Sequence, residues 1–213
     1  MKEAIIIIDV SGAEKFSDEL ADLGLIVTEA TAMTRVMENW FGWKECDPQQ
    51  TLLVFPGNGA NIVRQYLNPA WLAKWRGFRF YAKRFWQPGE DPQVVAERIF
   101  PDQMVVGAKR VVVIDDVFSS GQTAKLIREK NYTWIPGVDW WAVGWISQRA
   151  VSLKGFSRSF TAEQFGTRTK KVPINSLSTL LADINIAQSY ATRNFERPEE
   201  FLSLLDRVSI KSA

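Results

Sequence analysis

The sequence predicts an α/β fold in which a parallel sheet is flanked by helices. Short runs of β-branched and other apolar residues alternate with stretches of helical spacing, the order expected of strand–helix–strand units. Strands connected in this way lie parallel, through right-handed crossovers. A chain of 213 residues is long enough for one such domain with accessory segments.

Three segments are expected along the chain. Residues 1–50 are predicted to form an N-terminal accessory segment, residues 51–183 the core, and residues 184–213 a C-terminal helical tail. In the accessory segment the pattern predicts a strand over residues 4–10, "AIIIIDV", and helices over residues 13–23 and 28–43.

The core is predicted from five short apolar runs. These expected strands are "TLLVF" (51–55), "FRFYA" (78–82), "RVVVID" (110–115), "WWAVGWIS" (140–147) and "VPIN" (172–175). The expected helices are "IVRQYLNPAWLAKW" (62–75), "VVAERIF" (94–100), "GQTAKLIREK" (121–130), "SLSTLLADI" (176–184) and "RPEEFLSLLDRV" (197–208). Residues 56–61, 83–93 and 150–171 are expected to be loops or irregular chain.

Composition excludes several kinds of chemistry. The sequence has no histidine, so Ser-His-Asp triads, histidine–zinc sites and imidazole acid–base catalysis are ruled out. A single cysteine, Cys46, allows neither an internal disulfide framework nor a cysteine-rich metal site. The net charge of +2 gives no argument for nucleic acid, and no apolar run approaches the roughly 20 residues of a membrane span. A cytoplasmic protein with no membrane partner is the expectation.

The most informative stretch is "VVVIDDVFSSGQT", residues 111–123. Val111 to Ile114 suit a central strand that is buried on both faces, so Asp115 and Asp116 fall near its carboxyl end, where ligands of parallel sheets bind. The following small residues lead into a helix whose first N–H groups favour phosphate. This loop is Ser119, Ser120, Gly121, Gln122 and Thr123. Carboxylates repel phosphate, so the two acids suit the hydroxyls of a sugar that carries the phosphate, or Mg²⁺ bound to that sugar. The acids and the loop together indicate a phosphorylated ribose.

The same stretch resembles the signature of the type I phosphoribosyltransferases: an apolar strand, two acids, two variable residues, two small residues, Gly, any residue and Thr. The resemblance covers 13 residues, with Ser120 where many members have Thr. It implies that Asp115 and Asp116 engage the ribose hydroxyls of phosphoribosyl pyrophosphate (PRPP), often beside Mg²⁺, and that residues 119–123 bind its 5-phosphate. Two other interpretations are a P-loop nucleotide site, although the required Gly-Lys-Ser/Thr is missing, and a plain strand–turn–helix.

Two further loops occupy positions that the resemblance makes functional. "FPGNGAN" follows the first core strand, where family members bind pyrophosphate with backbone amides; Pro56, Gly57, Asn58 and Gly59 are the candidates. Arg64, in the following helix, is the nearest cation, whereas many members have one in the loop itself. "AKRFWQPGEDPQ" is placed like a mobile loop, and Lys83 and Arg84 at its base could offset charge on departing pyrophosphate. A solvated surface loop is the alternative.

The expected function is Mg²⁺-dependent transfer of phosphoribose between PRPP and a nucleobase or related acceptor. Residues near 150–172 are expected to contribute the hood over the base. The alternatives are a non-enzymatic regulator that senses PRPP or a nucleotide, and an accessory protein for another phosphorylated ligand. Nine Trp residues suggest core packing or a homodimer interface, with stacking on the ring of a ligand as the alternative. Asp9 follows four isoleucines as a phosphatase nucleophile would, but "VSG" after it lacks that family's second acid.

Overall fold

The structure, a computed structural model, describes residues 4–44, 46–75, 77–81, 84–85, 93–94, 105–132, 135–148, 153–165 and 174–212. The chain forms two compact units. One contains residues 1–32 and 169–213, and the other residues 33–168. These boundaries differ from the predicted ones: the strand and helix expected to close the core belong to the first unit, and residues 33–50 belong to the second.

The larger unit contains a five-stranded parallel sheet in the order β4-β3-β7-β8-β9. Its strands are β3 (Thr51–Pro56), β4 (Gly77–Tyr81), β7 (Arg110–Phe118), β8 (Asp139–Gln148) and β9 (Arg158–Phe165). Its helices are α2 (Ala30–Trp43), which spans the boundary, α3 (Gly57–Tyr66), α4 (Pro69–Leu72) and α6 (Gln122–Tyr132), with a 3-10 turn, η2 (Pro48–Gln50). The predicted parallel sheet flanked by helices is confirmed.

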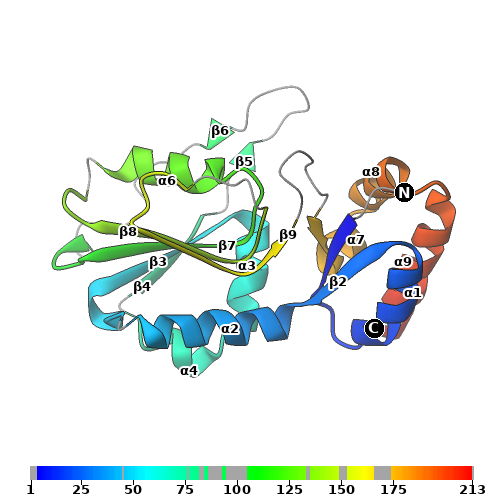
Figure 1. Ribbon diagram of the computed structural model, residues 1–213, viewed down its shortest axis with the longest axis horizontal. Coiled ribbons are helices and arrows are strands. Elements are labelled where there is room, and N and C mark those ends of the chain that lie inside the picture. The colour runs from blue at the N-terminus through cyan, green and yellow to red at the C-terminus, as the bar shows by residue number, and fades with distance from the viewer. Residues whose placement is uncertain are drawn as a thin grey trace. The chain divides into compact units, whose positions relative to one another are not determined.

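Helices cover both faces of this sheet, α6 on one and α2 with α3 on the other (Figure 1). On the α6 face, Val111 and Val113 of β7 pack with Ala124 and Ile127 of α6 in one buried cluster. Because side chains of a strand alternate between faces, the odd-numbered positions of β7 face α6 in this stretch.

Tryptophans fill the opposite face. Trp40 of α2 meets Trp141 of β8 edge to face at 5.5 Å, and the Nε1 of Trp145 donates to Thr34 Oγ1 at 3.0 Å. Trp71 and Trp75 pack against each other at 4.8 Å. All of these rings except Trp71 are buried, so they bind helices to the sheet through large apolar areas.

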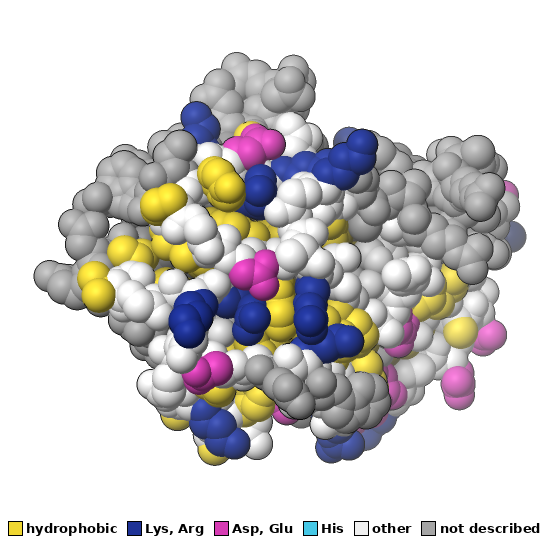
Figure 2. Space-filling model, turned by 60° about the vertical axis from the view of Figure 1, so that its left-hand side comes forward, with side chains coloured by type: hydrophobic (Ala, Val, Ile, Leu, Met, Phe, Trp, Pro, Cys, Tyr) yellow, Lys and Arg dark blue, Asp and Glu magenta, His cyan; other side chains and the backbone are white. Residues whose placement is uncertain are grey.

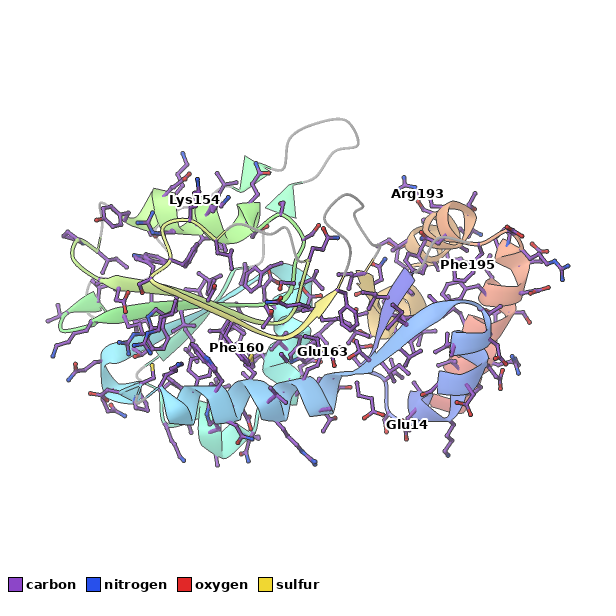
Figure 3. All side chains as sticks on the ribbon, in the orientation of Figure 1. Glu14, Lys154, Phe160, Glu163, Arg193 and Phe195 are labelled. Atoms are coloured by element: carbon purple, nitrogen blue, oxygen red, sulfur yellow. The ribbon has the colours of Figure 1, made fainter. Side chains whose placement is uncertain are left out.

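The smaller unit contains a three-stranded parallel sheet in the order β10-β1-β2. Its strands are β1 (Ala4–Ile8), β2 (Leu25–Glu29) and β10 (Ile174–Ser176), and its helices are η1 (Ala13–Phe16), α1 (Ser17–Asp22), α7 (Leu177–Ala182), α8 (Ile184–Asn194) and α9 (Pro198–Ser212). Ile6 and Ile8 of β1 pack with residues of α1 and α7–α9 in one core. Phe195, labelled in Figure 3, stacks on Phe201 at 4.7 Å and joins α8 to α9.

Several predicted elements are corrected. Residues 25–29 form β2, so the helix expected from residue 28 begins at Ala30. Within the predicted helical tail, α8 was not predicted as a separate element. The chain after Arg149 is not irregular throughout, since residues 158–165 form β9 at the edge of the main sheet. The expected loop 83–93 includes Arg84 and Phe85 of β5 (Arg84–Phe85), which pairs antiparallel with β6 (Gln93–Val94). Val94 is therefore strand, and the rest of the helix expected over residues 94–100 lies outside the described residues.

The surface carries both signs of charge. Several Lys and Arg side chains gather on the face shown in Figure 2, with Asp or Glu side chains among them. In the part of the chain that the structure describes, no helix has the length and apolar character required to cross a membrane.

Candidate functional site

The order of the main sheet defines where a ligand site is expected. From β3 the chain moves to β4 on one side, and then returns to β7, β8 and β9 on the other. The direction of progress therefore reverses between β3 and β7. In open parallel sheets a crevice forms at such a reversal, beyond the carboxyl ends of the two strands. The two loops singled out in the sequence follow these two strands.

The acidic pair lies within β7 rather than after it, because the strand continues through Asp115 and Asp116 to Phe118. The Asp115 side chain is buried, with 4% of the residue exposed, and its Oδ1 accepts from the Asp116 backbone N at 3.0 Å. Asp116 is partly exposed, and its Oδ1 accepts from the Val117 backbone N at 2.9 Å. The two carboxylates thus have different environments.

They also lie on different faces of the sheet. Odd positions of β7 face α6, so Asp115 is on that side and Asp116 is on the side of α3. Gly144 of β8 is the register partner of Asp115. A Cβ at Gly144 would come within 2.6 Å of the Asp115 carbonyl oxygen and 2.8 Å of the Phe118 ring. Glycine is therefore required at this position for β7 and β8 to pair closely beside the acidic residues.

Gly59 of α3 brings the second loop to Asp116. A Cβ built on Gly59 would lie 2.2 Å from Asp116 Oδ1 and 2.4 Å from its Oδ2 and Cγ, distances that no real Cβ atom tolerates. The Asp116 carboxylate therefore rests directly on the backbone at Gly59, although 57 residues separate the two. Pro56, Gly57 and Gly59 are thus assembled with the acidic pair at the reversal point of the sheet.

The sequence predicts a loop over residues 56–61, and this prediction of secondary structure is wrong. Residues 57–61 form the first turns of helix α3. Pro56 ends β3 and precedes α3, and Gly57 has a φ of 74°, in the left-handed region that favours glycine. Pro56 is the N-cap residue of α3, and its side chain has no hydrogen-bond acceptor. The first N–H groups of α3 therefore receive no hydrogen bond from the side chain of the N-cap residue. Asn58 is part of this turn.

Residues 119–123, which the sequence predicts as a phosphate loop, join the end of β7 to the start of α6. Ser119 and Ser120 are exposed, Gly121 has a φ of 71°, and Gln122 begins α6. The Gln122 backbone N donates to Ser120 Oγ at 3.3 Å, and Thr123 lies in the first turn of the helix. The chain therefore passes from a strand through a short loop of small residues to the N-terminus of a helix. This order is compatible with phosphate binding.

The remaining predicted site residues are less fully described. Lys83 lies outside the described residues, and for Arg84 the structure describes only its place in β5. Arg64, the cation nearest the Gly57–Gly59 turn in sequence, donates from Nε to Asn61 Oδ1 at 3.1 Å. No cluster of three or more metal-ligating Asp, Glu, Cys or His side chains occurs among the described residues.

Sequence reasoning missed two features near this edge of the sheet. One is Gly144, which lies in an apolar strand and carries no local turn signal. The other is a set of hydroxyl and carboxamide side chains from β8 and β9 that line a cavity of about 110 Å³. Ser147 and Gln148 were within or next to a predicted strand, but β9 itself was not predicted, so its polar residues had no assigned face.

No protein-family model matches the chain, and no curated protein matches it. Solved structures similar to it include the Helicobacter pylori xanthine-guanine-hypoxanthine phosphoribosyltransferase, with 10% identity, 88% of this chain and 97% of that chain covered, and a TM-score of 0.49. A Pyrococcus horikoshii purine phosphoribosyltransferase is 13% identical, with 83% and 93% covered and a TM-score of 0.46. A Neisseria gonorrhoeae hypothetical protein with bound ppGpp is 15% identical, with 68% and 82% covered and a TM-score of 0.43. At TM-scores below 0.5, these likenesses do not by themselves establish a shared function.

Proposed function

We propose that the protein binds PRPP at the carboxyl ends of β3 and β7 and transfers its phosphoribosyl group to a nucleobase or related acceptor. The observation that carries the proposal is the contact of the Asp116 carboxylate with the backbone at Gly59. It brings the start of α3 against β7, the strand whose end leads into α6, and the N-termini of both helices suit phosphate.

The three parts of the site suit three parts of one ligand. Residues 119–123 would bind the 5-phosphate through loop and helix N–H groups, and the turn of Gly57 and Gly59 would bind the pyrophosphate. Asp116, which contacts the backbone at Gly59 and precedes residues 119–123 in the chain, would accept hydrogen bonds from the ribose hydroxyls. Asp115, being buried, would position the strand and Asp116 rather than contact the sugar.

The donor set fits Mg²⁺ as a partner of the ligand. Mg²⁺ is usually held by one or two carboxylates together with substrate phosphates and several waters. Asp116, the partly exposed acid, would supply the protein oxygen, and the bound ion would neutralise charge on the departing pyrophosphate. Lys83 and Arg84, which follow β4 in the chain, are proposed to assist in the same way.

In the proposed reaction, a nitrogen of the acceptor forms a bond to the anomeric carbon of the ribose while the bond from that carbon to the pyrophosphate oxygen breaks. The electron pair leaves with pyrophosphate, and the acceptor nitrogen loses its proton to solvent or to a base that the sequence does not identify. Positioning and charge stabilisation are the main protein contributions, which is consistent with a site that has no histidine.

The second candidate function is a non-enzymatic sensor of PRPP or a nucleotide. It is favoured by the absence of Lys and Arg from residues 56–61, where a cation would help pyrophosphate to leave. Such a protein would use the same phosphate loop and Asp116 to bind its ligand.

Calorimetric titration with PRPP and Mg²⁺, followed by an assay for pyrophosphate release with a panel of bases, separates these functions. Asp116→Asn should weaken PRPP binding roughly 10- to 100-fold, because hydrogen bonds to a charged group contribute about 1.5–3 kcal/mol. The matched control is Asp206→Asn, at an exposed position of α9, which should bind like wild type. Binding with release supports the transferase, and binding without release supports the sensor. If wild type does not bind PRPP, or if Asp116→Asn binds as well as the control, the proposal is wrong.

A further inference from the structure

Phe118 is the last residue of β7 and directly precedes the proposed phosphate loop. Its side chain is one of the largest that the larger unit buries completely, with only 1% of the residue exposed. A ring that is enclosed in this way cannot contact a ligand. Any part that Phe118 has in the site must therefore be exerted through the loop that follows it.

The Phe118 side chain lies on the α6 face of the sheet, although its position in β7 predicts the other face. Odd-numbered residues of β7 face α6 as far as Asp115, so alternation alone would turn Phe118 toward α3. Its side chain nevertheless belongs to the same buried cluster as Val111 and Val113. The alternation of side chains therefore changes phase between Asp115 and Phe118.

The acidic pair lies where this change of phase occurs. The Asp116 backbone N donates to Asp115 Oδ1 at 3.0 Å, and the Val117 backbone N donates to Asp116 Oδ1 at 2.9 Å. Two successive N–H groups of β7 are thus bonded to side chains of the strand itself, beyond Val113, the last residue in register with β3. Backbone donors that are bonded locally allow a strand to depart from its regular pleat.

Gly144 of β8 provides the space that the Phe118 ring occupies. Trp140 and Ala142 of β8 belong to the α6-face cluster, so the α-carbon of Gly144 presents its missing side chain to the same face. A Cβ built there would lie 2.8 Å from Cε2 and 3.2 Å from Cδ2 of Phe118. The edge of the ring therefore lies over the glycine, so close that no methyl group fits between them.

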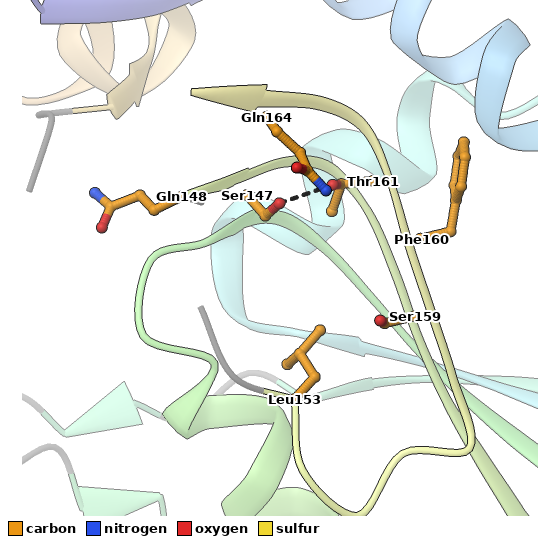
Figure 4. A pocket seen from close by; sticks show the side chains of 7 residues that line it. All are labelled: Ser147, Gln148, Leu153, Ser159, Phe160, Thr161 and Gln164. Atoms are coloured by element: carbon orange, nitrogen blue, oxygen red, sulfur yellow. Dashed lines mark hydrogen bonds between the residues drawn. The ribbon is translucent and has the colours of Figure 1, made fainter. Parts of the chain in front are cut away.

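The α6 face is not filled to the same degree one strand further. Thr161 of β9 is the register partner of Gly144, and it borders a cavity of about 110 Å³ that is lined by residues of β8, β9 and their connection (Figure 4). Phe118 is not among the described side chains that line this cavity. The complete burial of the ring is thus a local fit at Gly144 rather than a property of the whole face.

The same cluster holds the other end of the phosphate loop. Ala124, which directly follows loop residues 119–123, is fully buried, and Ile127 lies one turn further along α6. Both residues belong to the cluster that contains Phe118. The five loop residues are therefore flanked on both sides by anchors in one core.

We propose, on the basis of the function proposed above, that Phe118 is a positioning residue for the 5-phosphate of PRPP. Its ring, seated over Gly144, holds the start of the loop so that residues 119–123 are ordered before the phosphate arrives. A loop that is already ordered loses less conformational entropy on binding, which raises affinity. Asp116 and the turn at Gly59 lie on the α3 face, so the ring acts on the 5-phosphate and not on the pyrophosphate.

The test compares two substitutions in the same buried cluster. Phe118→Leu removes the ring edge over Gly144 and keeps an apolar side chain, and Phe118→Met is a second, less disruptive variant. The matched control is Ile127→Val, which shortens a fully buried side chain of α6 away from the loop. Urea unfolding followed by Trp fluorescence checks that each variant is folded, and calorimetry with Mg²⁺ present gives PRPP affinity. ³¹P NMR separates the signal of the bound 5-phosphate from those of the pyrophosphate group.

We expect Phe118→Leu to weaken PRPP binding roughly three- to tenfold and to change the ³¹P signal of the bound 5-phosphate, with the pyrophosphate signals as in wild type. Phe118→Met should act in the same direction by a smaller factor, because its flexible side chain partly refills the space over Gly144. Ile127→Val should bind PRPP like wild type, although it also loses core packing.

Equal PRPP affinity of Phe118→Leu and Ile127→Val would overturn this inference, and so would equal changes in the 5-phosphate and pyrophosphate signals. Either result would leave the PRPP site itself intact. Failure of wild type to bind PRPP would instead refute the function on which the inference rests.

Discussion

Asp9 and Asp116 are both found where a central parallel strand ends, one in each compact unit, and their surroundings give them different roles. Asp9 directly follows β1, between β2 and β10; Asp116 lies near the end of β7, between β3 and β8. In both sheets the direction of strand progress reverses next to this strand, so the topology favours a ligand site at each position equally.

The Asp9 carboxylate accepts hydrogen bonds from its own chain. Its Oδ1 accepts from the Ser178 backbone N at 2.8 Å, its Oδ2 accepts from the Ser178 hydroxyl, and only 7% of the residue is exposed. The carboxylate therefore fixes the start of α7 to the end of β1. At Asp116 the neighbouring helix presents Gly59 instead of a hydrogen-bonding side chain, and the carboxylate remains partly exposed. A strand-end aspartate becomes a candidate site only where the adjoining helix leaves it accessible.

Gly59→Ala is the variant with the largest expected effect, because it displaces the Asp116 carboxylate and leaves Asp9 unchanged. The added methyl group would lie 2.2 Å from Asp116 Oδ1, so the carboxylate must move from its position over α3. We expect PRPP affinity to fall about 10- to 100-fold, similar to the loss of a hydrogen bond to a charged group. The control is Gly42→Ala in α2, where a Cβ meets nothing within 4 Å. Calorimetric titration with PRPP checks the pair, and equal affinity of the two variants would contradict the role given to Asp116.

Asp9→Ala tests the opposite role. Removing the carboxylate leaves both Ser178 donors without their acceptor, so we expect the smaller unit to lose about 1.5–3 kcal/mol of stability with no change in PRPP affinity. All nine Trp residues belong to residues 33–168, so Trp fluorescence reports the larger unit, whereas far-ultraviolet circular dichroism reports helices of both. In urea, the dichroism transition should shift to lower concentration. A loss of PRPP binding in this variant would assign a ligand role to Asp9.

Ser178→Ala should have a smaller effect of the same kind. It removes the hydrogen bond from the Ser178 hydroxyl to Asp9 and keeps the one from the Ser178 backbone N, so a loss of about 1 kcal/mol is expected. The urea midpoint of the dichroism transition should fall between those of wild type and Asp9→Ala. An effect as large as that of Asp9→Ala would mean that the hydroxyl, and not the backbone, is the main partner.

A third aspartate, Asp139 at the start of β8, gives the smallest expected effect and extends the comparison to pH. Burial alone would raise its pKa, but hydrogen bonds from Ser157, Trp141 and Arg110 together hold the pKa of this carboxyl below its ordinary value. Its contribution to stability is therefore present at neutral pH and is lost as pH falls through the lowered pKa. Urea unfolding of wild type and Asp139→Asn should differ at pH 7, and the difference should shrink as the pH falls through the lowered pKa of Asp139. A difference that persists in acid would exclude this charge as its source.

The parts predicted from the sequence are those encoded by contiguous residues. The run from Val111 to Thr123 contains strand, acids, loop and helix start together, and the structure has them in that order. The contact of Gly59 with Asp116 was not predictable, because it depends on the pairing of β3 with β7 across intervening chain. β9 was missed because "RSFTAEQF" lies at a sheet edge, where half-exposed positions accept polar residues and weaken the apolar signal. The strand orders next to Asp9 and Asp116 likewise depend on pairing between strands that are far apart in the chain.

The pairing of β1 with β10 has a consequence for biosynthesis. Because these neighbouring strands come from opposite ends of the chain, the smaller sheet cannot be completed until the ribosome has translated past residue 176, whereas every strand of the larger sheet is already present by residue 165. At roughly 5–20 residues per second, β1 and β2 wait on the order of ten seconds for their partner strand. During that interval the apolar "AIIII" segment must be shielded by nascent-chain contacts or by chaperones.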